Sequence, residues 1–418
     1  MSETSQLDIL TTKVYKCLQD IITKLQINNC SVNIKKKVDY GENHLGVIVN
    51  VQISNEEGQV VNMVIKNAPK SAMYRDFFPI HNVFLRENFM YSKALKEFTK
   101  FQNNKNVKCT FGYFPKLYGA VLDLDNEAII LEDVNELEYK NMKREDPINY
   151  AHALLVVQEL GKFHAISFAM KDQNKELFDE LSQNTVDSHF TQFGQKGSVK
   201  NCYENWAKAA SISLHKFQEK SIYDKINALK SDFYNILCDI VSPEICKDYA
   251  VICHGDVWVG NLLFKYLSNG QPESVCFLDW QISRYGSPVL DLSQFLFTCT
   301  DKSLRDQHYE DLIKAYYKSL CNFLQQLGSD PNTLFPEEVL QQHLRKFSVF
   351  GLIMAMQVTW LTLNVPKDDF YDIDAATTGD IDKVVDNFNK PNTEKYNLRI
   401  RDIILDYFKF GYDLQNVS

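Results

Sequence analysis

Three oxygen-bearing side chains near the middle of the chain have the types and spacing of a phosphoryl-transfer site. Asp256 lies within His254-Gly-Asp-Val-Trp258, Asn261 follows five residues later, and Asp279 comes directly after the apolar segment Val275-Cys-Phe-Leu278. In such a site one aspartate accepts or orients the proton of an attacking hydroxyl, while an asparagine and a second aspartate hold Mg²⁺ against nucleotide phosphates. The three residues therefore predict transfer of a phosphate to a hydroxyl.

Each of these residues also has a simple structural interpretation. Gly255-Asp256 is a pair typical of turns, Asn261 suits a helix cap, and Asp279 suits the end of a strand. On its own, the Gly-Asp pair favours the turn. The occurrence of all three residues at this spacing favours the chemical interpretation, with Asp256 as the base and Asn261 and Asp279 as oxygen ligands of Mg²⁺.

Residues around the three are expected to support the site. His254 can hydrogen-bond to backbone, and Trp258 can fill space beneath the loop. Asp291, within Ser287-Pro-Val-Leu-Asp-Leu292, either bonds the backbone amides of the catalytic loop or caps a helix.

The N-terminal part of the chain must supply groups for the nucleotide. Lys66 ends the apolar strand expected at residues 60–66, and Glu87 lies in the following helix. We expect an ion pair of ~4 Å or less between them, although a charged residue at a strand end is usually solvated. Gly41 and Asn43, in a turn between strands, are expected to wrap the phosphates of ATP. Backbone around Glu132 and Val134, at the junction of two lobes, is expected to bind adenine.

Hydrophobic periodicity predicts a strand-rich N-terminal lobe over residues 1–133. It comprises helices over residues 7–25 and 77–101, and strands over 31–34, 46–53, 60–66, 114–117 and 128–131. The remaining residues, 134–418, predict a large and mainly helical lobe. Its helices are expected over 148–170, within 190–237, and over 291–326, 336–363 and 380–414. Two short strands are expected around the motif loop in 251–278, and the polar segment 171–197 is expected to be an insertion over the site. This is an α+β fold with two lobes around a cleft.

Composition excludes several classes of protein. A chain of 418 residues exceeds one ordinary core, and its net charge of −9 does not suit nucleic-acid binding. The first thirty residues lack the pattern of a signal peptide. The most apolar stretch, 349–363, is shorter than the roughly 20 residues of a membrane span, so a buried helix is expected. Ten cysteines without CxxC spacing indicate reduced thiols in a cytoplasmic protein. The sequence gives no indication of oligomeric state.

The ordered motifs resemble the ecdysteroid kinase-like (CHK kinase-like) family, within the choline/aminoglycoside kinase branch of the protein-kinase-like fold. The resemblance covers roughly residues 38–317. His-Gly-Asp-x-Trp-x-x-Asn with Leu-Asp-x-Gln is its most specific part. The matching segments are Gly41-Glu-Asn43, Lys66, Glu87, Leu131-Glu-Asp133, Gly161-Lys-Phe-His-Ala165, His254 to Asn261, and Leu278-Asp-Trp-Gln281.

The resemblance implies a bilobal kinase that uses ATP and Mg²⁺ to phosphorylate a hydroxyl of a small molecule, with ecdysteroids as the substrates that name the family. By position, Asp256 resembles the catalytic base, Asn261 and Asp279 the metal ligands, and Lys66 with Glu87 the phosphate-binding pair. The chain departs from the family where His44 and Gly46 replace an aromatic and a small hydroxyl residue, and where Trp280 replaces a more usual phenylalanine.

Three functions remain open from the sequence. The first is a kinase of a lipophilic alcohol such as a steroid, which the 12% aromatic content favours and for which Trp206, Phe347, Phe350 and Trp360 are candidate wall residues. The second is a kinase of a polar substrate such as choline or an aminoglycoside, which the acids Asp368, Asp369, Asp372 and Asp374 would suit. The third is a catalytically silent nucleotide-binding protein, against which the intact motif residues count.

Overall fold

Over residues 30–55 the N-terminal sheet has one buried face, because apolar and polar side chains alternate along its strands there. In β2 (Val47–Asn55), Val49, Val51 and Ile53 are buried, and the residues between them are half-buried or exposed. This is the pattern of a sheet covered on one side. The amphipathic helix α2 (Thr12–Lys24) packs on the buried face and shares one hydrophobic core with it.

The computed structural model describes residues 10–36, 46–70, 75, 79–143, 145–193, 197–364 and 390–414. Within these residues the N-terminal sheet is antiparallel, with the order β1-β2-β3-β5-β4. Its other strands are β1 (Cys30–Lys36), β3 (Val60–Asn67), β4 (Leu117–Val121) and β5 (Ala128–Glu132). Because β3 lies at the centre of the sheet, its C-terminal end is covered on both sides by neighbouring strands.

The helix expected over residues 77–101 is divided in the structure. It consists of α4 (Ile80–Phe89), a π-helical turn (Met90–Ala94) and α5 (Leu95–Asn104). Phe98 of α5 packs on Phe163, with ring centroids 5.6 Å apart. The apolar face of α4 and α5 thus belongs to the large helical core and not to the core between α2 and the sheet.

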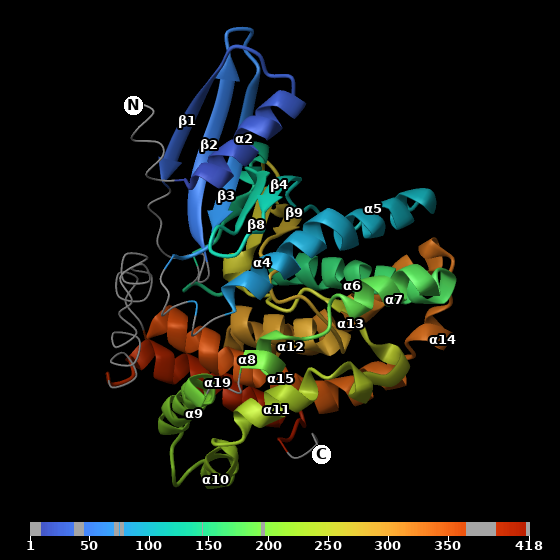
Figure 1. Cartoon of the computed structure of the whole chain (residues 1–418). Coiled ribbons are helices and arrows are strands. Elements are labelled where there is room, and N and C mark those ends of the chain that lie inside the picture. The colour runs from blue at the N-terminus through green and yellow to red at the C-terminus, as the bar shows by residue number, and fades with distance from the viewer. Residues whose placement is uncertain are drawn as a thin grey trace.

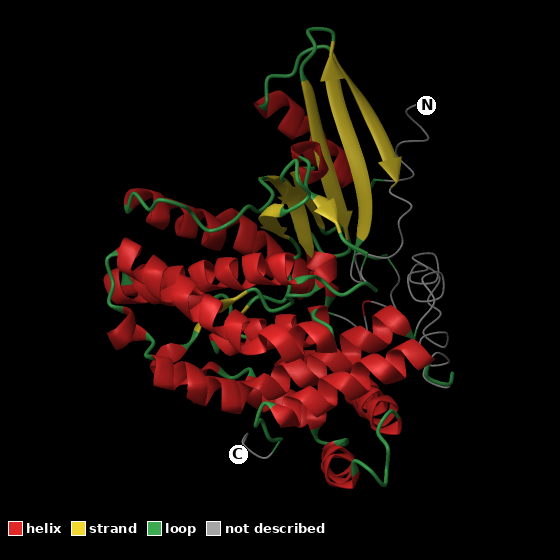
Figure 2. Ribbon diagram, turned by 180° about the vertical axis from the view of Figure 1, so that it is seen from behind, coloured by secondary structure: helices red, strands yellow, loops and turns green. Residues whose placement is uncertain are grey.

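The rest of the described chain is mainly helical, and its longest helices lie side by side (Figure 1; Figure 2). Glycines permit helix α6 to approach α13 closely, and α15 to approach α12. A Cβ atom on Gly161 of α6 would lie 2.7 Å from the Tyr316 carbonyl oxygen of α13, and one on Gly351 of α15 would lie 2.4 Å from the Ser293 carbonyl of α12. The helices are α6 (Tyr150–Gln173), α7 (Lys175–Gln183), α8 (His189–Phe193), α9 (Gly197–Ile212), α10 (Lys220–Leu229), α11 (Phe233–Ile240), α12 (Pro288–Cys299), α13 (Lys302–Leu327), α14 (Pro331–Leu334), α15 (Glu337–Leu363) and α19 (Glu394–Lys409).

Short strands interrupt the helices where the sequence motifs lie. The region 251–278 contains three strands and not two: β7 (Val251–Cys253), β8 (Leu262–Tyr266) and β9 (Pro272–Phe277). The strand β10 (Arg284–Gly286) pairs with β7, and β6 (Lys140–Asn141) pairs with β8. These small sheets hold the two aspartate-bearing loops between the helices.

One expected strand was wrong. Residues 114–116 are not in a strand, and β4 begins only at Leu117. Pro115 has no backbone N–H to donate to a sheet. Tyr113 pairs instead with β9, where its N–H donates to the Val275 carbonyl and its carbonyl accepts from Phe277 N–H.

Two helical segments, Tyr150–Gln173 and Pro331–Leu363, are long and apolar enough to cross a membrane by length and composition alone. However, 78% and 72% of their most apolar windows are buried inside the protein, as in core helices. For residues 349–363 this agrees with the expected buried helix. All ten cysteines are described and unpaired.

The arrangement confirms the expected α+β fold with a strand-rich N-terminal lobe and a larger helical lobe (Figure 1). The boundary after residue 133 remains a proposal. Part of the segment 171–197 forms α7 and α8, and the apolar residues Phe178 and Leu181 of α7 are buried in the core.

Candidate active site

Lys66 is buried, with 3% of its surface exposed, at the end of the central strand β3. Its Nζ atom lies 2.8 Å from Glu87 Oε2, 2.8 Å from Asp279 Oδ1 and 3.1 Å from Gln281 Oε1. The expected ion pair with Glu87 is present, and the solvated alternative is wrong. Lys66 thereby joins the sheet, helix α4 and the loop after β9 at one point.

The charges around Lys66 do not balance. Burial lowers the pKa of Lys66, but the carboxylates of Asp279 and Glu87 outweigh burial and raise it, so the ammonium stays protonated. Burial raises the pKa of Glu87 to about 7, against the opposing effect of Lys66. When both carboxylates are ionised, they leave an excess of negative charge around one ammonium, which a bound cation would offset.

Asp279 is held in an uncommon backbone conformation. Its φ is +64°, in the left-handed region that non-glycine residues rarely adopt, and such strain is concentrated at functional sites. The N–H of the preceding residue, Leu278, donates to the Asn261 carbonyl at 2.9 Å, so Asn261 and Asp279 lie on adjacent backbone segments. A carboxylate and an amide side chain in a region of excess negative charge are a donor set that fits Mg²⁺.

Asp256 receives one amide hydrogen bond on each carboxylate oxygen. Asn261 Nδ2 donates to Oδ2 at 2.9 Å, and Gln294 Nε2 of α12 donates to Oδ1 at 3.0 Å. Burial, and then the charge of Asp279, raise the pKa of Asp256 to about 7, although the two amides lower it. A half-buried carboxylate with this pKa is well matched to accepting a proton near neutral pH.

Asp291 holds the loop that carries Asp256. It is fully buried and accepts hydrogen bonds from His254 N at 2.6 Å and Gly255 N at 2.8 Å. The alternative role of helix cap is wrong, because Ser287 is the N-cap of α12. Gly255 has φ of +90° and a Cβ atom there would lie 2.1 Å from the Ile282 carbonyl oxygen, so the loop requires glycine.

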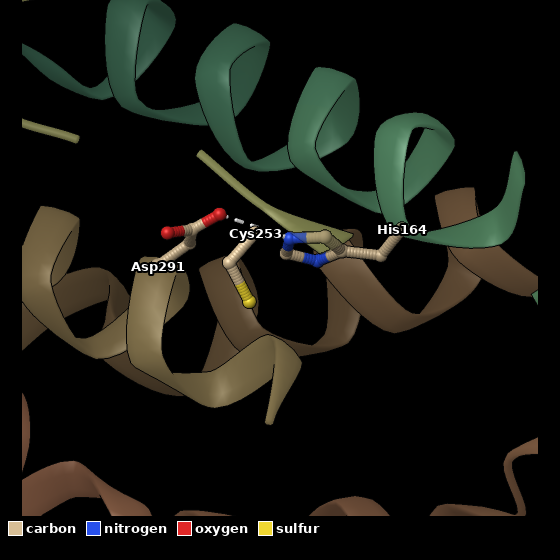
Figure 3. Close-up of side chains that lie close together, drawn as sticks. All are labelled: His164, Cys253 and Asp291. Atoms are coloured by element: carbon tan, nitrogen blue, oxygen red, sulfur yellow. Dashed lines mark hydrogen bonds and ion pairs between the residues drawn. The ribbon is translucent and has the colours of Figure 1, made fainter. Parts of the chain in front are cut away.

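A buried cluster behind the loop contains His164, Cys253 and Asp291, which Figure 3 shows together. His164 Nε2 lies 3.2 Å from Asp291 Oδ2, and its Nδ1 lies 2.8 Å from the Tyr316 hydroxyl. The Cys253 thiol is directed to the Ser287 carbonyl at 3.3 Å, and burial raises its pKa well above the ordinary value. Because each of the three side chains has hydrogen-bond partners within the protein, we interpret the cluster as a hydrogen-bond network that supports the loop.

His254 connects the two aspartate loops. Its Nδ1 accepts from Asp256 N at 3.2 Å, which leaves Nε2 to donate to the Leu278 carbonyl at 2.9 Å. Burial lowers the pKa of His254, in keeping with a neutral ring. Trp258 is buried beside Gly260. His254 and Trp258 therefore have the supporting positions expected of them.

The structure does not test the expected adenine contacts. Glu132 N donates to the Lys116 carbonyl, and the Glu132 carboxylate accepts from the Tyr113 hydroxyl at 2.7 Å. Val134 begins a short 3-10 turn that Asp133 caps. Adenine binding by backbone around Glu132 and Val134 stays a prediction, and Gly41 and Asn43 lie outside the described residues.

The model of the ecdysteroid kinase-like family matches residues 40–329, which is more than half of the chain. The chain belongs to the ecdysteroid kinase-like family. The match includes all the residues expected to do chemistry, from Gly41 to Asp291.

Two curated relatives are kinases of Psilocybe species. The 4-hydroxytryptamine kinase of Psilocybe cyanescens is 25% identical over 192 residues, which are 43% of this chain and 45% of that protein. The 4-hydroxytryptamine kinase of Psilocybe cubensis is 26% identical over 194 residues, with coverage of 43% and 46%. The chain thus spans about half the length of these relatives. Among solved structures, the GDP complex of wild-type aminoglycoside 2'-phosphotransferase-IIIa aligns over 95% of this chain and 100% of that chain, at 11% identity and a TM-score of 0.42.

Two residues contact the site without having been assigned a role from the sequence, and a third lies beside it. Gln281 binds Lys66, and Gln294 binds Asp256. Arg86, next to Glu87, donates to the Ser283 and Val186 carbonyls and so ties α4 to the helical lobe. The available signal for Gln294 was its polarity within the mainly apolar helix 288–299, which also carries Asp291, Ser293 and Thr298. Nothing in that pattern says which group Gln294 faces.

Proposed function

We propose that this chain is an ATP-dependent kinase that transfers the γ-phosphate to a hydroxyl of a small molecule. The observation that carries the proposal is the contact of buried Lys66 with both Glu87 and Asp279. Asn261 in turn connects the Asp279 loop to Asp256. Phosphoryl transfer consists mainly of positioning and charge stabilisation, and this arrangement supplies both.

The residues divide the work between nucleotide and acceptor. Lys66, held by Glu87, would donate hydrogen bonds to the nucleotide phosphates, as a positioned lysine does in kinases. Asn261 and Asp279 would hold Mg²⁺, which when bound neutralises phosphate charge. Asp256 would accept or orient the proton of the acceptor hydroxyl. The presence of all these groups favours an active enzyme over a silent nucleotide-binding protein.

For the acceptor we propose a lipophilic alcohol, with ecdysteroid-like steroids as the first candidates. The family to which the chain belongs supports this choice, as do the aromatic side chains near the catalytic loop. Phe190 and Phe350 pack edge-to-face with ring centroids 6.1 Å apart, and both contact the buried Arg284 guanidinium, at 4.8 and 5.2 Å from their centroids. Arg284 donates to the Gly255 carbonyl. The acids at 368–374 that would favour a cationic acceptor lie outside the described residues.

The test is a transfer assay with γ-labelled ATP and Mg²⁺ across a panel of acceptors. The panel contains ecdysteroids, simpler steroids, xenobiotic alcohols, choline, an aminoglycoside and 4-hydroxytryptamine. The last compound appears in the names of two relatives. We expect labelled steroid product with the native protein and none with Asp256→Asn. Phosphorylation of choline or the aminoglycoside alone would replace the lipophilic acceptor with a polar one. Binding of Mg-ATP without transfer to any acceptor would contradict kinase activity.

A further inference from the structure

Gln294 has an unusual position for a polar residue. It lies on α12, one helical turn after Asp291, and is fully buried. Its Nε2 donates to Asp256 Oδ1 at 3.0 Å. Because an ionised carboxylate only accepts hydrogen bonds, the amide must present its nitrogen to Asp256. This fixes the orientation of the amide group and leaves its oxygen on the other side.

The oxygen of this amide has no hydrogen-bond partner among the residues that the structure describes. A buried polar atom without a partner destabilises a fold, and α12 is otherwise a helix of buried, mainly apolar residues. An apolar residue of similar length would therefore suit the core better. Packing and stability do not account for a glutamine here, whereas its bond to Asp256 does.

The two amides on Asp256 act on different oxygens and come from different elements. Asn261 lies in the turn that precedes β8, while Gln294 projects from a long helix of the core. A carboxylate bonded at both oxygens cannot rotate freely about its Cβ–Cγ bond. Fixing its plane fixes the direction in which its remaining lone pairs can meet an acceptor hydroxyl, and catalysis by a general base is sensitive to this geometry.

We propose that Gln294 is a positioning residue of the phosphoryl transfer, which holds the Asp256 carboxylate in the orientation that receives the acceptor hydroxyl. This inference rests on the proposed kinase function. Gln294 acts through Asp256 and not on the nucleotide, because the contacts described for it involve neither Lys66 nor Asp279.

The test compares Gln294→Met, which preserves length but removes the donor, with Gln294→Glu, which preserves shape but places a second carboxyl group against Asp256. We expect kcat for the acceptor to fall roughly 10- to 100-fold in both variants, a part of the 10²–10⁴-fold that a general base contributes. KM for ATP and calorimetric Mg-ATP affinity should stay unchanged, and the melting temperature of Gln294→Met should equal or exceed that of the native protein.

Gln102→Met is the matched control, because Gln102 is a buried glutamine with a structural bond. Its Oε1 accepts from Phe111 N at 2.8 Å, far along the chain from the motif loops. This control should lower the melting temperature and leave kcat unchanged. The opposite pattern in Gln294→Met, with a lower melting temperature and native kcat, would overturn the proposal.

A double variant separates positioning from other effects. In an Asp256→Asn background, Gln294→Met should cause little further loss of kcat, since the carboxylate that Gln294 orients is already absent. Fully multiplicative losses would show that Gln294 acts independently of Asp256 and would overturn the inference alone. If the native protein transferred phosphate to no acceptor, the proposed function itself would fail, and the inference with it.

Discussion

Replacing Lys66 by methionine should destabilise the protein far more than replacing an exposed lysine of similar geometry. Lys66 is the one cation within ion-pair distance of Glu87 and Asp279 in the described part of the chain, and all three side chains are at least nine-tenths buried. Removing one partner of a buried ion pair typically costs 3–5 kcal/mol, because a charge remains without compensation. We therefore expect Lys66→Met to lower the free energy of unfolding by about 3–5 kcal/mol.

The structure also predicts an order among variants. In Glu87→Gln, Lys66 keeps Asp279 at 2.8 Å, so the expected loss is about 1.5–3 kcal/mol, that of one charged hydrogen bond. The control is Lys13→Met. Lys13 pairs with Asp123 at the same 2.8 Å distance, but both side chains are more than half exposed. Exposed pairs of this kind contribute about 0–1 kcal/mol.

The assay is urea unfolding of each variant at several pH values. Burial raises the folded-state pKa of Glu87 to about 7, so its ionisation disfavours the folded state, and this cost grows as pH rises from the unfolded pKa toward the folded one. Without Lys66, which lowers that pKa, the cost must increase. The penalty of Lys66→Met should therefore be larger near pH 8 than near pH 5. A penalty below ~1 kcal/mol that does not change with pH would refute the buried-charge argument.

Further predictions concern turnover and ligand binding. Asp256→Asn should reduce kcat by about 10²–10⁴-fold with Mg-ATP affinity retained by calorimetry; more than half of native turnover would place the base elsewhere. Because the pKa of Asp256 is raised to about 7, kcat/KM of the native enzyme should increase with pH through that value as the carboxylate ionises, and a flat profile would contradict this role. Asp279→Ala should abolish metal-dependent ATP binding while Asn261→Ala weakens it less; unchanged Mg-ATP affinity in the first would refute the ligand assignment. Gly46→Ser places a Cβ atom 2.8 Å from Lys66 Cγ, so the lysine must shift from the position that meets the nucleotide. A strain of ~1.4 kcal/mol in the ATP-bound state would raise KM for ATP about tenfold, which steady-state kinetics can measure. A native KM would show that the lysine moves aside freely.

The parts of the fold that follow from periodicity could be predicted from the sequence. Alternation in β2 and β3 placed Lys66 at the end of a strand, and the motif spacing placed Asp256 and Asp279 in loops between short strands. The Lys66–Glu87 pair followed from the same reasoning, because a strand and the next helix can bring two such residues together. The catalytic and ligand roles themselves stay predictions.

Other features depend on tertiary contacts that no local pattern shows. The π-helical turn after α4 inserts one residue without altering the apolar composition of the segment, so the sequence indicated one continuous helix. The strand expected over residues 114–117 was wrong for a local reason, because Pro115 has no N–H to donate to a sheet. Gln294 could not be assigned, because the packing of α12 against the catalytic loop decides which buried group its amide meets.

The packing of α4 and α5 has a consequence for how the enzyme opens. One hydrophobic core lies between α2 and the sheet, and a larger one joins α4, α5 and the helical lobe and takes in Ile129 and Leu131 of β5. Arg86 adds hydrogen bonds on the same side, since it ties α4 to carbonyls of that lobe. Motion that admits a nucleotide should therefore keep α2 with the sheet and α4 with the helices, and it must loosen the packing of Ile129 and Leu131 on the larger core. The seam between these two parts passes through the contact of Lys66 with Glu87, so opening the enzyme would stretch the ion pair that a bound nucleotide needs.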